Sequence, residues 1–538
     1  MKKVLSFVLA VVLIVTSLMS LTVSSAVYMI GDLDNDGTIN GKDGNMLKRC
    51  IAGAAILDDI RCGDVDKNGI INGTDNNLLL QYLAGVYIIE QPEEEPETPD
   101  VPVLSKVEIQ EYTVVYPENG SVYEQYAAEI LCDYVKDNYA VELALTDDTA
   151  TEVEYEILVG NTNRSESAVN IEFADNQYIL KTDGKKLVLL GKDYMVGGAV
   201  GDLTHYCMSD GYVVVDTIPT VDTVLNYTPV EGDNVILMIG DGMGFNHIDF
   251  ASLYTRVWWP EWNYEGFIAE SFPNQGESIT YCVQDMLGDY SFQRIITDSA
   301  ASGTAMSTGW KTQRRKLGIN RYDQEVKNVR EMAHDLGYKT AVLSTEPSSG
   351  ATPSAFLVHC PDRGDATTIL AQQAELIANN EVTLIKGDIN DNLLADTKDA
   401  IDLISTDSDG FFIMIEESYI DKASEKIPSG QYTYDDLAHY MVRFNSSIQY
   451  AATFTAATPG TVLIVTADHE TGVMTSGGMI SNGGNHSNLN VPIYAMGYGT
   501  EYFNGIAVEN VKIGQFIADI YGYMGPTDDI SGIVDNPY

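Results

Sequence analysis

Three long apolar runs in the last three hundred residues end in acidic side chains. The run NVILMIGDGMG ends in Asp241, the run GFFIMIEESYID contains Glu416, and the run TVLIVTADHE ends in the pair Asp468 and His469. One acidic residue after a strand is usually a turn residue or a helix cap. Three acidic strand ends that meet in one crevice predict a set of metal ligands.

The segment ITDSAASGTAMSTG contains a candidate nucleophile, Ser299. This serine follows an aspartate and opens a run of small residues that can pack closely as a helix. A helix N-terminus at this position would stabilise negative charge on a serine oxygen and on a bound phosphate. Taken alone, Ser299 reads as an ordinary helix cap. The three acidic strand ends make the nucleophile the preferred interpretation.

The elements that carry these residues form an α/β pattern. Continuous Val, Ile and Leu runs alternate with helical stretches such as VKNVREMAHDLG. YKTAVLST and VPIYAMG have the same apolar character as the three runs above. This alternation predicts a mostly parallel sheet that is buried on both faces. In such folds the ligand crevice lies beyond the carboxyl ends of the strands, where the acidic residues fall.

Several short motifs follow one another in the last three hundred residues, and their order is typical of a known protein family. IGDGMG, TDSAAS, the tripeptide ATP at 351–353, FFIMIE with a later ID, TADHE, and NH at 485–486 follow one another between about residues 232 and 525. In this order they resemble the alkaline phosphatase family. The resemblance implies an α/β, alkaline-phosphatase-like sandwich with a mostly parallel central sheet, and a phosphate monoester as substrate. Members of the family are often dimers, so a homodimer is one expectation.

The resemblance also implies roles for single residues. Ser299 matches the nucleophile that becomes phosphorylated, and Arg363, thirteen residues after Gly350, matches the phosphate-clamping arginine. The implied ligands are Asp241, Asp468 and His469 for the zinc that activates the serine, Asp421 and His486 for a second zinc, and Thr352, Glu416 and the shared Asp241 for magnesium. Two metals about 4 Å apart can stabilise both the attacking and the leaving oxygen of an in-line displacement.

Two positions depart from the family pattern. Glu425 stands where the family has a histidine ligand of the second zinc. A carboxylate there would shift the site toward Mg²⁺, Mn²⁺ or Ca²⁺, although Zn²⁺ also accepts carboxylates. The alternative is that Glu425 is a solvated surface residue and the second metal is weak or absent. Gly350 stands where the family has Asp or His near magnesium, which leaves Lys422 without that partner; Glu346 and Glu417 are candidates to replace it.

These departures keep other activities open. A phosphodiesterase of the same superfamily would need more room on the side of the leaving group. A sulfatase would need a Cys/Ser-x-Pro-x-Arg motif, which the sequence lacks. A non-catalytic module that binds metal or phosphate is the alternative from another class. Intact Ser299 and Arg363 argue against it.

A duplicated unit precedes this region. Residues 31–53 and 63–85 are identical at more than half of their positions and have the spacing of calcium-binding loops. The side-chain oxygens at loop positions one, three, five, nine and twelve are Asp32, Asp34, Asp36, Asn40 and Asp43 in the first copy, and Asp64, Asp66, Asn68, Asn72 and Asp75 in the second. Position seven, Thr38 or Ile70, would contribute its backbone carbonyl.

Each loop runs directly into a single helix, and in this respect residues 28–90 resemble a type I dockerin. This resemblance implies bound Ca²⁺ and a cohesin domain of a cellulosome scaffold as the partner. Loop positions ten and eleven, which help to choose the cohesin, are Gly-Lys and Gly-Thr here, where the family commonly has Ser-Thr. The specific cohesin therefore stays open.

Composition and the N-terminus point to a secreted protein. The 538 residues include 31 Lys plus Arg and 78 Asp plus Glu, for a net charge of −47, which argues against partners that are nucleic acids or anionic membranes. Lys2 and Lys3 precede an apolar run and small residues at 24–26, which predicts a signal peptide; an uncleaved anchor is the alternative. None of the six cysteines forms a Cys-x-x-Cys pair.

The predicted parts are a signal peptide at 1–26, a dockerin at 28–90, a Pro/Glu linker at 91–102, a small α+β domain at 103–230 and a catalytic domain at 231–538.

Overall fold

The computed structural model describes residues 105–389, 392–406 and 408–534, and the isolated positions Ile30, Leu33, Ile39, Leu47, Val65, Leu78 and Leu79. The predicted signal peptide, the linker and all twelve predicted calcium ligands lie outside the described residues. The chain divides into two compact units: Met1–Val107 with Tyr206–Thr217, and Glu108–His205 with Ile218–Tyr538. The domain boundaries expected from the sequence stay predictions.

The first unit is described at few positions. Leu33 and Val65 occupy the same place in the two repeats, as do Leu47 and Leu79, and all four side chains are buried. This unit also contains all but Glu108 of a three-stranded sheet in the order β1 (Lys106–Glu108), β8 (Tyr212–Val214) and β7 (Met208–Ser209), in which β7 and β8 run antiparallel.

The second unit begins with a small α+β layer. Its six-stranded sheet has the order β3 (Ala144–Asp147), β2 (Thr113–Tyr116), β4 (Glu156–Val159), β6 (Lys186–Gly191), β5 (Gln177–Asp183) and β9 (Leu225–Asn226). The first four strands run parallel, and β5 is antiparallel to both of its neighbours. The helices are α5 (Val122–Tyr139) and α6 (Val196–Tyr206). The amphipathic pattern in the sequence predicts α5, and the Asp183-Gly184 turn predicts the β5–β6 hairpin.

The central sheet confirms the predicted fold class. Its eight strands have the order β15 (Leu384–Lys386), β14 (Lys339–Ser344), β16 (Phe411–Glu417), β10 (Asn234–Gly240), β17 (Thr461–Thr466), β20 (Val491–Met496), β11 (Asn274–Ile279) and β21 (Ala507–Glu509). The first five strands are parallel, β20 is antiparallel to β17 and β11, and β11 is parallel to β21. The sheet is therefore mixed and mostly parallel.

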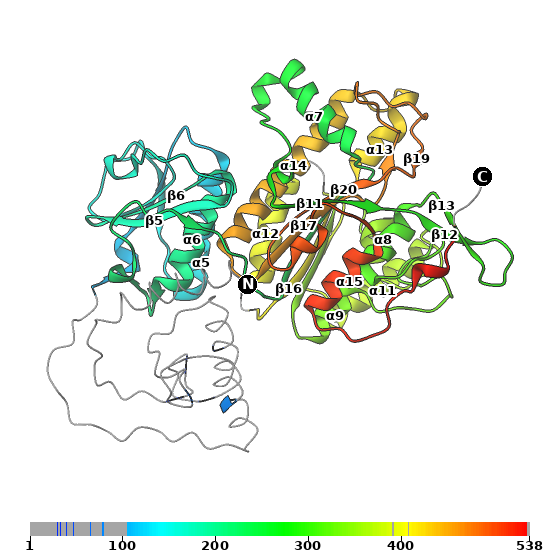
Figure 1. The fold of residues 1–538 in the computed structure, drawn as a ribbon, viewed down its shortest axis with the longest axis horizontal. Helices are drawn as coiled ribbons and strands as arrows, with labels where there is room; N and C mark the ends of the chain where they lie inside the picture. Colours follow the sequence, from blue (N-terminus) through cyan, green and yellow to red (C-terminus); the bar gives the residue numbers. More distant parts are fainter. Residues whose placement is uncertain are drawn as a thin grey trace, which may run out of the picture. The chain divides into compact units, whose positions relative to one another are not determined.

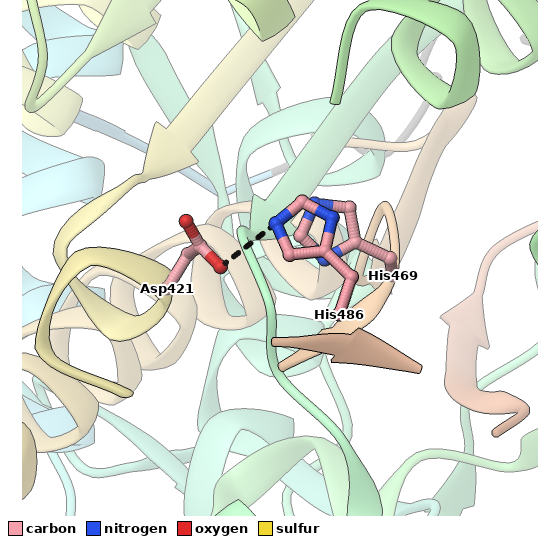
Figure 2. A group of neighbouring side chains, drawn as sticks. All are labelled: Asp421, His469 and His486. Carbon is pink, nitrogen blue, oxygen red and sulfur yellow. Dashed lines mark ion pairs between the residues drawn. The ribbon is translucent and has the colours of Figure 1, made fainter. Parts of the chain in front are cut away.

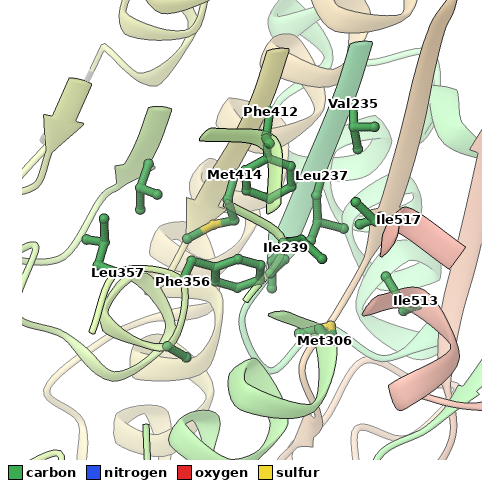
Figure 3. Close-up of a cluster of buried hydrophobic side chains, with 14 of the residues drawn as sticks. Val235, Leu237, Ile239, Met306, Phe356, Leu357, Phe412, Met414, Ile513 and Ile517 are labelled. Atoms are coloured by element: carbon green, nitrogen blue, oxygen red, sulfur yellow. The ribbon is translucent and has the colours of Figure 1, made fainter. Parts of the chain in front are cut away.

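Helices cover both faces of this sheet (Figure 1). They are α7 (Phe245–Trp258), α8 (Ser299–Thr308), α9 (Val329–Asp335), α10 (Ala351–Ala355), α11 (Ala366–Ala378), α12 (Leu393–Ser405), α13 (Tyr419–Lys426), α14 (Tyr434–Ala457) and α15 (Val511–Ile520). On one face, alternate residues of β10 and β16 pack against α8, α10 and α15, and Figure 3 shows Leu237, Met414, Phe356 and Ile517 in this core. Removing one such side chain would cost about 2–5 kcal/mol, so the core holds the strand ends in place.

Helix α14 lies on the other face and connects the sheet to the small layer. It begins at the cap Thr433, whose hydroxyl accepts a hydrogen bond from the Asp436 amide at 3.2 Å. It packs against β17 on one side and α5 on the other, where Tyr126 and Tyr450 meet edge to face with ring centroids 5.5 Å apart. None of the helices in the described part of the chain is long and apolar enough to cross a bilayer.

Two short hairpins complete the second unit. They are β12 (Cys282–Asp285) with β13 (Phe292–Ile295), and β18 (Glu470–Thr471) with β19 (His486–Ser487), both antiparallel. The second hairpin pairs Thr471 with His486 and so brings the segment at 486 next to the end of β17.

Candidate active site

The acidic strand ends converge at one edge of the central sheet. The parallel register aligns Ile239 of β10 with Glu416 of β16 on one side and with Thr466 of β17 on the other. Asp241 and Asp468 each follow the end of their strand within two residues, so their carboxylates emerge beside Glu416 at the carboxyl ends of neighbouring strands. The sequence-based prediction that these groups share one crevice agrees with this geometry.

Ser299 is the first residue of α8 and lies against the same edge. Its side chain is buried, and its Oγ is 3.3 Å from Nε2 of His469. The preceding Asp298 caps the helix, because its carboxylate accepts a hydrogen bond from the Ala301 amide at 3.1 Å. Ser299 is therefore free of the capping role, and its hydroxyl faces the ligand group.

A first group of ligands surrounds the Ser299 hydroxyl. Nε2 of His469 is 3.5 Å from Oδ1 of Asp241 and 3.2 Å from Oδ2 of Asp468. In a tetrahedral zinc site with metal–ligand distances of about 2.1 Å, ligand atoms lie about 3.4 Å apart. Both carboxylate oxygens are buried, and neither has a hydrogen-bond partner among the described residues. This spacing fits a divalent cation bound by these three residues.

A second group contains Asp421, His469 and His486 (Figure 2). The two imidazoles stack with centroids 3.7 Å apart, and Nε2 of His486 is 3.6 Å from Oδ1 of Asp421. Nδ1 of His486 is 3.2 Å from the Thr297 carbonyl, which accepts its proton and leaves Nε2 with a lone pair for a metal. The Thr471 hydroxyl has the same role at His469, since it lies 3.2 Å from Nδ1 and donates to Asp421.

Glu425 lies at the edge of this second group. Its Oε1 is 3.8 Å from Nε2 of His486, while its Oε2 is 3.6 Å from Nζ of Lys426. Its side chain is 35% exposed. One turn of α13 separates Glu425 from Asp421, which places both carboxylates on the same face of the helix. The carboxylate is thus within reach of the second group.

A third group contains Thr352 and Glu416, and the charge of Glu416 acts on the Asp241 carboxyl. Thr352 of α10 is buried with its Oγ1 unpartnered among the described residues, and Oε1 of Glu416 is in the same state. The other oxygen of Glu416 accepts a hydrogen bond from the Ser344 hydroxyl at the end of β14. Hydroxyl and carboxylate oxygens are the ligands that Mg²⁺ prefers.

The adjacent Glu417 is held by a different partner. Its carboxylate accepts hydrogen bonds from Nε and Nη2 of Arg443 at 2.6 and 2.7 Å, and its backbone carbonyl accepts one from the Asp241 amide at 3.0 Å. This ion pair fixes the end of β16 next to the start of the loop that carries Asp241.

Burial and crowding shift the proton affinities of the site. Burial raises the pKa of Asp241 well above its ordinary value, and the charge of Asp468 raises it further. Burial also raises the pKa of Glu416, and it raises the pKa of Asp421 to about 7. Burial lowers the pKa of His469, so its imidazole is neutral near pH 7. A neutral imidazole among crowded carboxylates suits a bound cation, which would supply the missing positive charge.

Arg363 lies near the N-terminus of α8. Its Nη1 is 3.5 Å from Oδ2 of Asp298, and 32% of its side chain is exposed. The neighbouring Arg315 pairs with Asp362 at 2.6 Å, and its amide donates to Asp298. Arg363 is the more weakly held guanidinium, so it is the one with freedom to turn toward a phosphate next to Ser299.

The sequence-based reasoning missed the groups that orient the ligands. Thr471 and the Thr297 carbonyl set the tautomers of the two histidines, and Ser344 orients Glu416. These are common residue types at unremarkable spacings, so no pattern in the sequence identifies them. The structure otherwise brings together the predicted residues Ser299, Arg363, Asp241, Thr352, Glu416, Asp421, Glu425, Asp468, His469 and His486.

Comparisons with known proteins agree with this arrangement. Residues 232–390 and 374–486 match the alkaline phosphatase family, and residues 30–84 match the dockerin type I domain. Alkaline phosphatase of Escherichia coli is 35% identical over 132 residues, which are 24% of this chain and 26% of that protein. Alkaline phosphatase 4 of Bacillus subtilis is 26% identical over 318 residues, which are 45% of this chain and 62% of that protein.

A solved structure, the alkaline phosphatase of the Antarctic bacterium TAB5, is 25% identical to this chain. Its TM-score is 0.46, and the match covers 55% of this chain and all of that one. The curated relatives named above are matched over less than two thirds of their own length.

Proposed function

The chain carries an alkaline phosphatase family domain behind an N-terminal type I dockerin domain, and from this premise we propose that it is a secreted phosphomonoesterase. It hydrolyses phosphate monoesters through a phosphoserine at Ser299 and is attached to a cellulosome scaffold through a cohesin. The substrate class follows from the family and from the Ser299 hydroxyl beside the metal-ligand groups.

One observation carries the proposal. Four of the buried oxygens that lack hydrogen-bond partners among the described residues belong to residues that match family metal ligands: Asp241, Asp468, Thr352 and Glu416. An unpaired buried polar atom costs about 1–3 kcal/mol, so four in one cluster are expected only where a ligand satisfies them. Zn²⁺ and Mg²⁺ are the cations that the family uses, and the donor types fit both.

Bound divalent cations would stabilise the attacking and the leaving oxygen of an in-line displacement at phosphorus. The residues of the chain supply the rest. The Oγ of Ser299 lies next to the ligand groups. There it forms a bond to phosphorus as the bond between phosphorus and the ester oxygen breaks. The guanidinium of Arg363 matches two phosphoryl oxygens. Water then attacks the phosphoserine, which releases inorganic phosphate and restores the serine.

Glu425 acts as a ligand of the second zinc in this proposal. Its Oε1 lies 3.8 Å from Nε2 of His486, which is near the separation of two ligands on one ion. A carboxylate adds negative charge where the family has a neutral histidine. The site should therefore accept harder cations more readily and stabilise a leaving alkoxide less well.

The N-terminal part supplies attachment in this proposal. The ten side-chain ligands and the carbonyls of Thr38 and Ile70 would hold two Ca²⁺ ions, and the calcium-bound dockerin would bind a cohesin. The net charge of −47 argues against nucleic-acid and anionic-membrane partners.

Hydrolysis of p-nitrophenyl phosphate tests the function. The metal-stripped full chain is resupplied with Zn²⁺, Mg²⁺, Mn²⁺ or Ca²⁺, beside Ser299→Ala and the exposed control Ser165→Ala. We expect metal to restore turnover in the parent and in Ser165→Ala and to leave Ser299→Ala at least about 10³-fold slower. A folded, metal-loaded parent without turnover would contradict the proposal. Faster hydrolysis of bis-p-nitrophenyl phosphate would instead identify a phosphodiesterase.

A further inference from the structure

The backbone conformation at Gly350 does not require a glycine. Its φ is −59° and its ψ is 167°, which lie in a region that any L-residue adopts. It is the residue before α10 and lies two positions before Thr352. A side chain at position 350 would therefore cause no backbone strain. The reason for glycine must lie in what surrounds it.

The surrounding atom is the carboxylate of Glu346. A Cβ built on Gly350 would lie 1.9 Å from Oε1 of Glu346 and 2.1 Å from its Cδ. Both distances are far below any real contact. The space that a side chain at 350 would take is therefore filled by the carboxylate from four residues earlier in the chain. A side chain at position 350 would therefore require the Glu346 carboxylate to move from this place.

Glu346 is tied to the site on two sides. Its Oε2 is 3.1 Å from Nζ of Lys422, and its own amide donates to the Ser344 hydroxyl at 3.0 Å. That same hydroxyl donates to Glu416, so one residue separates Glu346 from a proposed magnesium ligand. The other candidate partner of Lys422, Glu417, accepts hydrogen bonds from Nε and Nη2 of Arg443.

We infer that Glu346 is a positioning residue that supplies the acidic side chain of the magnesium subsite in place of one at position 350, and that it holds the Lys422 ammonium beside that subsite. The inference rests on the proposed function for the identity of the subsite. It accounts for both positions together: Glu346 occupies the space that a side chain at 350 would take, and Lys422 has an acidic partner.

A side-chain exchange tests the inference. The variants are Glu346→Ala, Gly350→Asp and the double variant Glu346→Ala with Gly350→Asp, beside the exposed control Glu375→Ala. Calorimetric titration of Mg²⁺ into the zinc-loaded full chain measures affinity, and thermal melting measures stability. Loss of a group that supports a metal ligand typically weakens metal binding 10–100-fold. We expect about that loss in Glu346→Ala and no change in Glu375→Ala.

The double variant decides the outcome. Gly350→Asp alone should melt earlier than the parent, because its Cβ overlaps Glu346. The double variant should bind Mg²⁺ within about threefold of the parent, because the carboxylate returns at the alternative position. Affinity unchanged in Glu346→Ala, or a double variant no better than Glu346→Ala, would overturn the inference. If Glu346→Ala does not fold, Glu346→Gln keeps the shape and should show the same loss of affinity.

These measurements need no turnover. If the parent is inactive but the Mg²⁺ affinities of the variants change as expected, the proposed phosphatase is contradicted. The inference that Glu346 takes the place of an acidic side chain at position 350 is then still supported. An active parent whose Mg²⁺ affinity does not change in Glu346→Ala would support the proposed phosphatase and overturn the inference about Glu346.

Discussion

The Arg443–Glu417 ion pair should be a main support of the site. Both side chains are almost fully buried, with 6% and 0% exposure, and the guanidinium donates twice to the carboxylate. Replacing Arg443 by Met removes the counter-charge and leaves Glu417 buried. Hydrogen bonds from the Thr345 hydroxyl at 3.1 Å and the Tyr419 amide at 3.0 Å would remain.

The expected loss of stability can be worked out from this geometry. Breaking a buried pair by removing one partner costs about 3–5 kcal/mol, and the two remaining hydrogen bonds favour the lower value. Unfolding entropy is about 2.1 cal/mol/K per residue, so for roughly 300 residues a loss of about 3 kcal/mol lowers Tm by about 5 °C. Adding Glu417→Gln should recover part of this loss, because the buried group is then neutral.

Tryptophan fluorescence is the assay. The four tryptophans, Trp258, Trp259, Trp262 and Trp310, all lie within the predicted catalytic domain, so their signal reports the melting of that part of the chain. The exposed Arg256→Met is the control and should melt like the parent. A drop in Tm below about 1 °C in Arg443→Met, or no recovery in the double variant, would refute the reasoning.

Two further predictions concern the helix that carries Asp421. Buried His247, whose Nε2 lies 3.1 Å from the Ser424 hydroxyl, has its pKa lowered by burial to about 4. Between about pH 6.5 and 4 the unfolded chain therefore binds a proton at this histidine that the folded chain does not bind. Lowering the pH through that window decreases the free energy of unfolding by up to about 3 kcal/mol. In His247→Gln, urea unfolding should show a flatter pH dependence over that range, and an identical slope would argue against a neutral His247. Glu425→His should raise both zinc affinity and p-nitrophenyl phosphate turnover; if metal content and rate stay the same, Glu425 does not contact the metal.

The strand ends are the part of the site that the sequence predicts best. Asp241, Glu416 and Asp468 each interrupt a continuous apolar run, and parallel strands bring their carboxyl ends to one edge. Burial on both faces makes such runs easy to recognise. It also hides their direction: the apolar run of β20 looks like the others, yet the strand is antiparallel to both neighbours.

Contacts that depend on turns could not be predicted. Glu346 fills the space next to Gly350 because the chain folds back through a turn in which the Gly350 amide donates to the Pro347 carbonyl at 2.7 Å. The sequence offers both Glu346 and Glu417 as partners for Lys422, and only the packing of α14 assigns Glu417 to Arg443. The tight approach of α6 to α14, in which Gly197 faces the Thr453 carbonyl, is another contact of this kind.

The most direct test of the central claim is to trap the covalent intermediate. The zinc- and magnesium-loaded full chain is mixed with p-nitrophenyl phosphate, quenched in acid, digested and analysed by mass spectrometry. The account predicts a phosphoryl group on Ser299, absent from the metal-stripped protein and from Ser299→Ala. Turnover without phosphate on Ser299, or with phosphate on Ser302 instead, would contradict it.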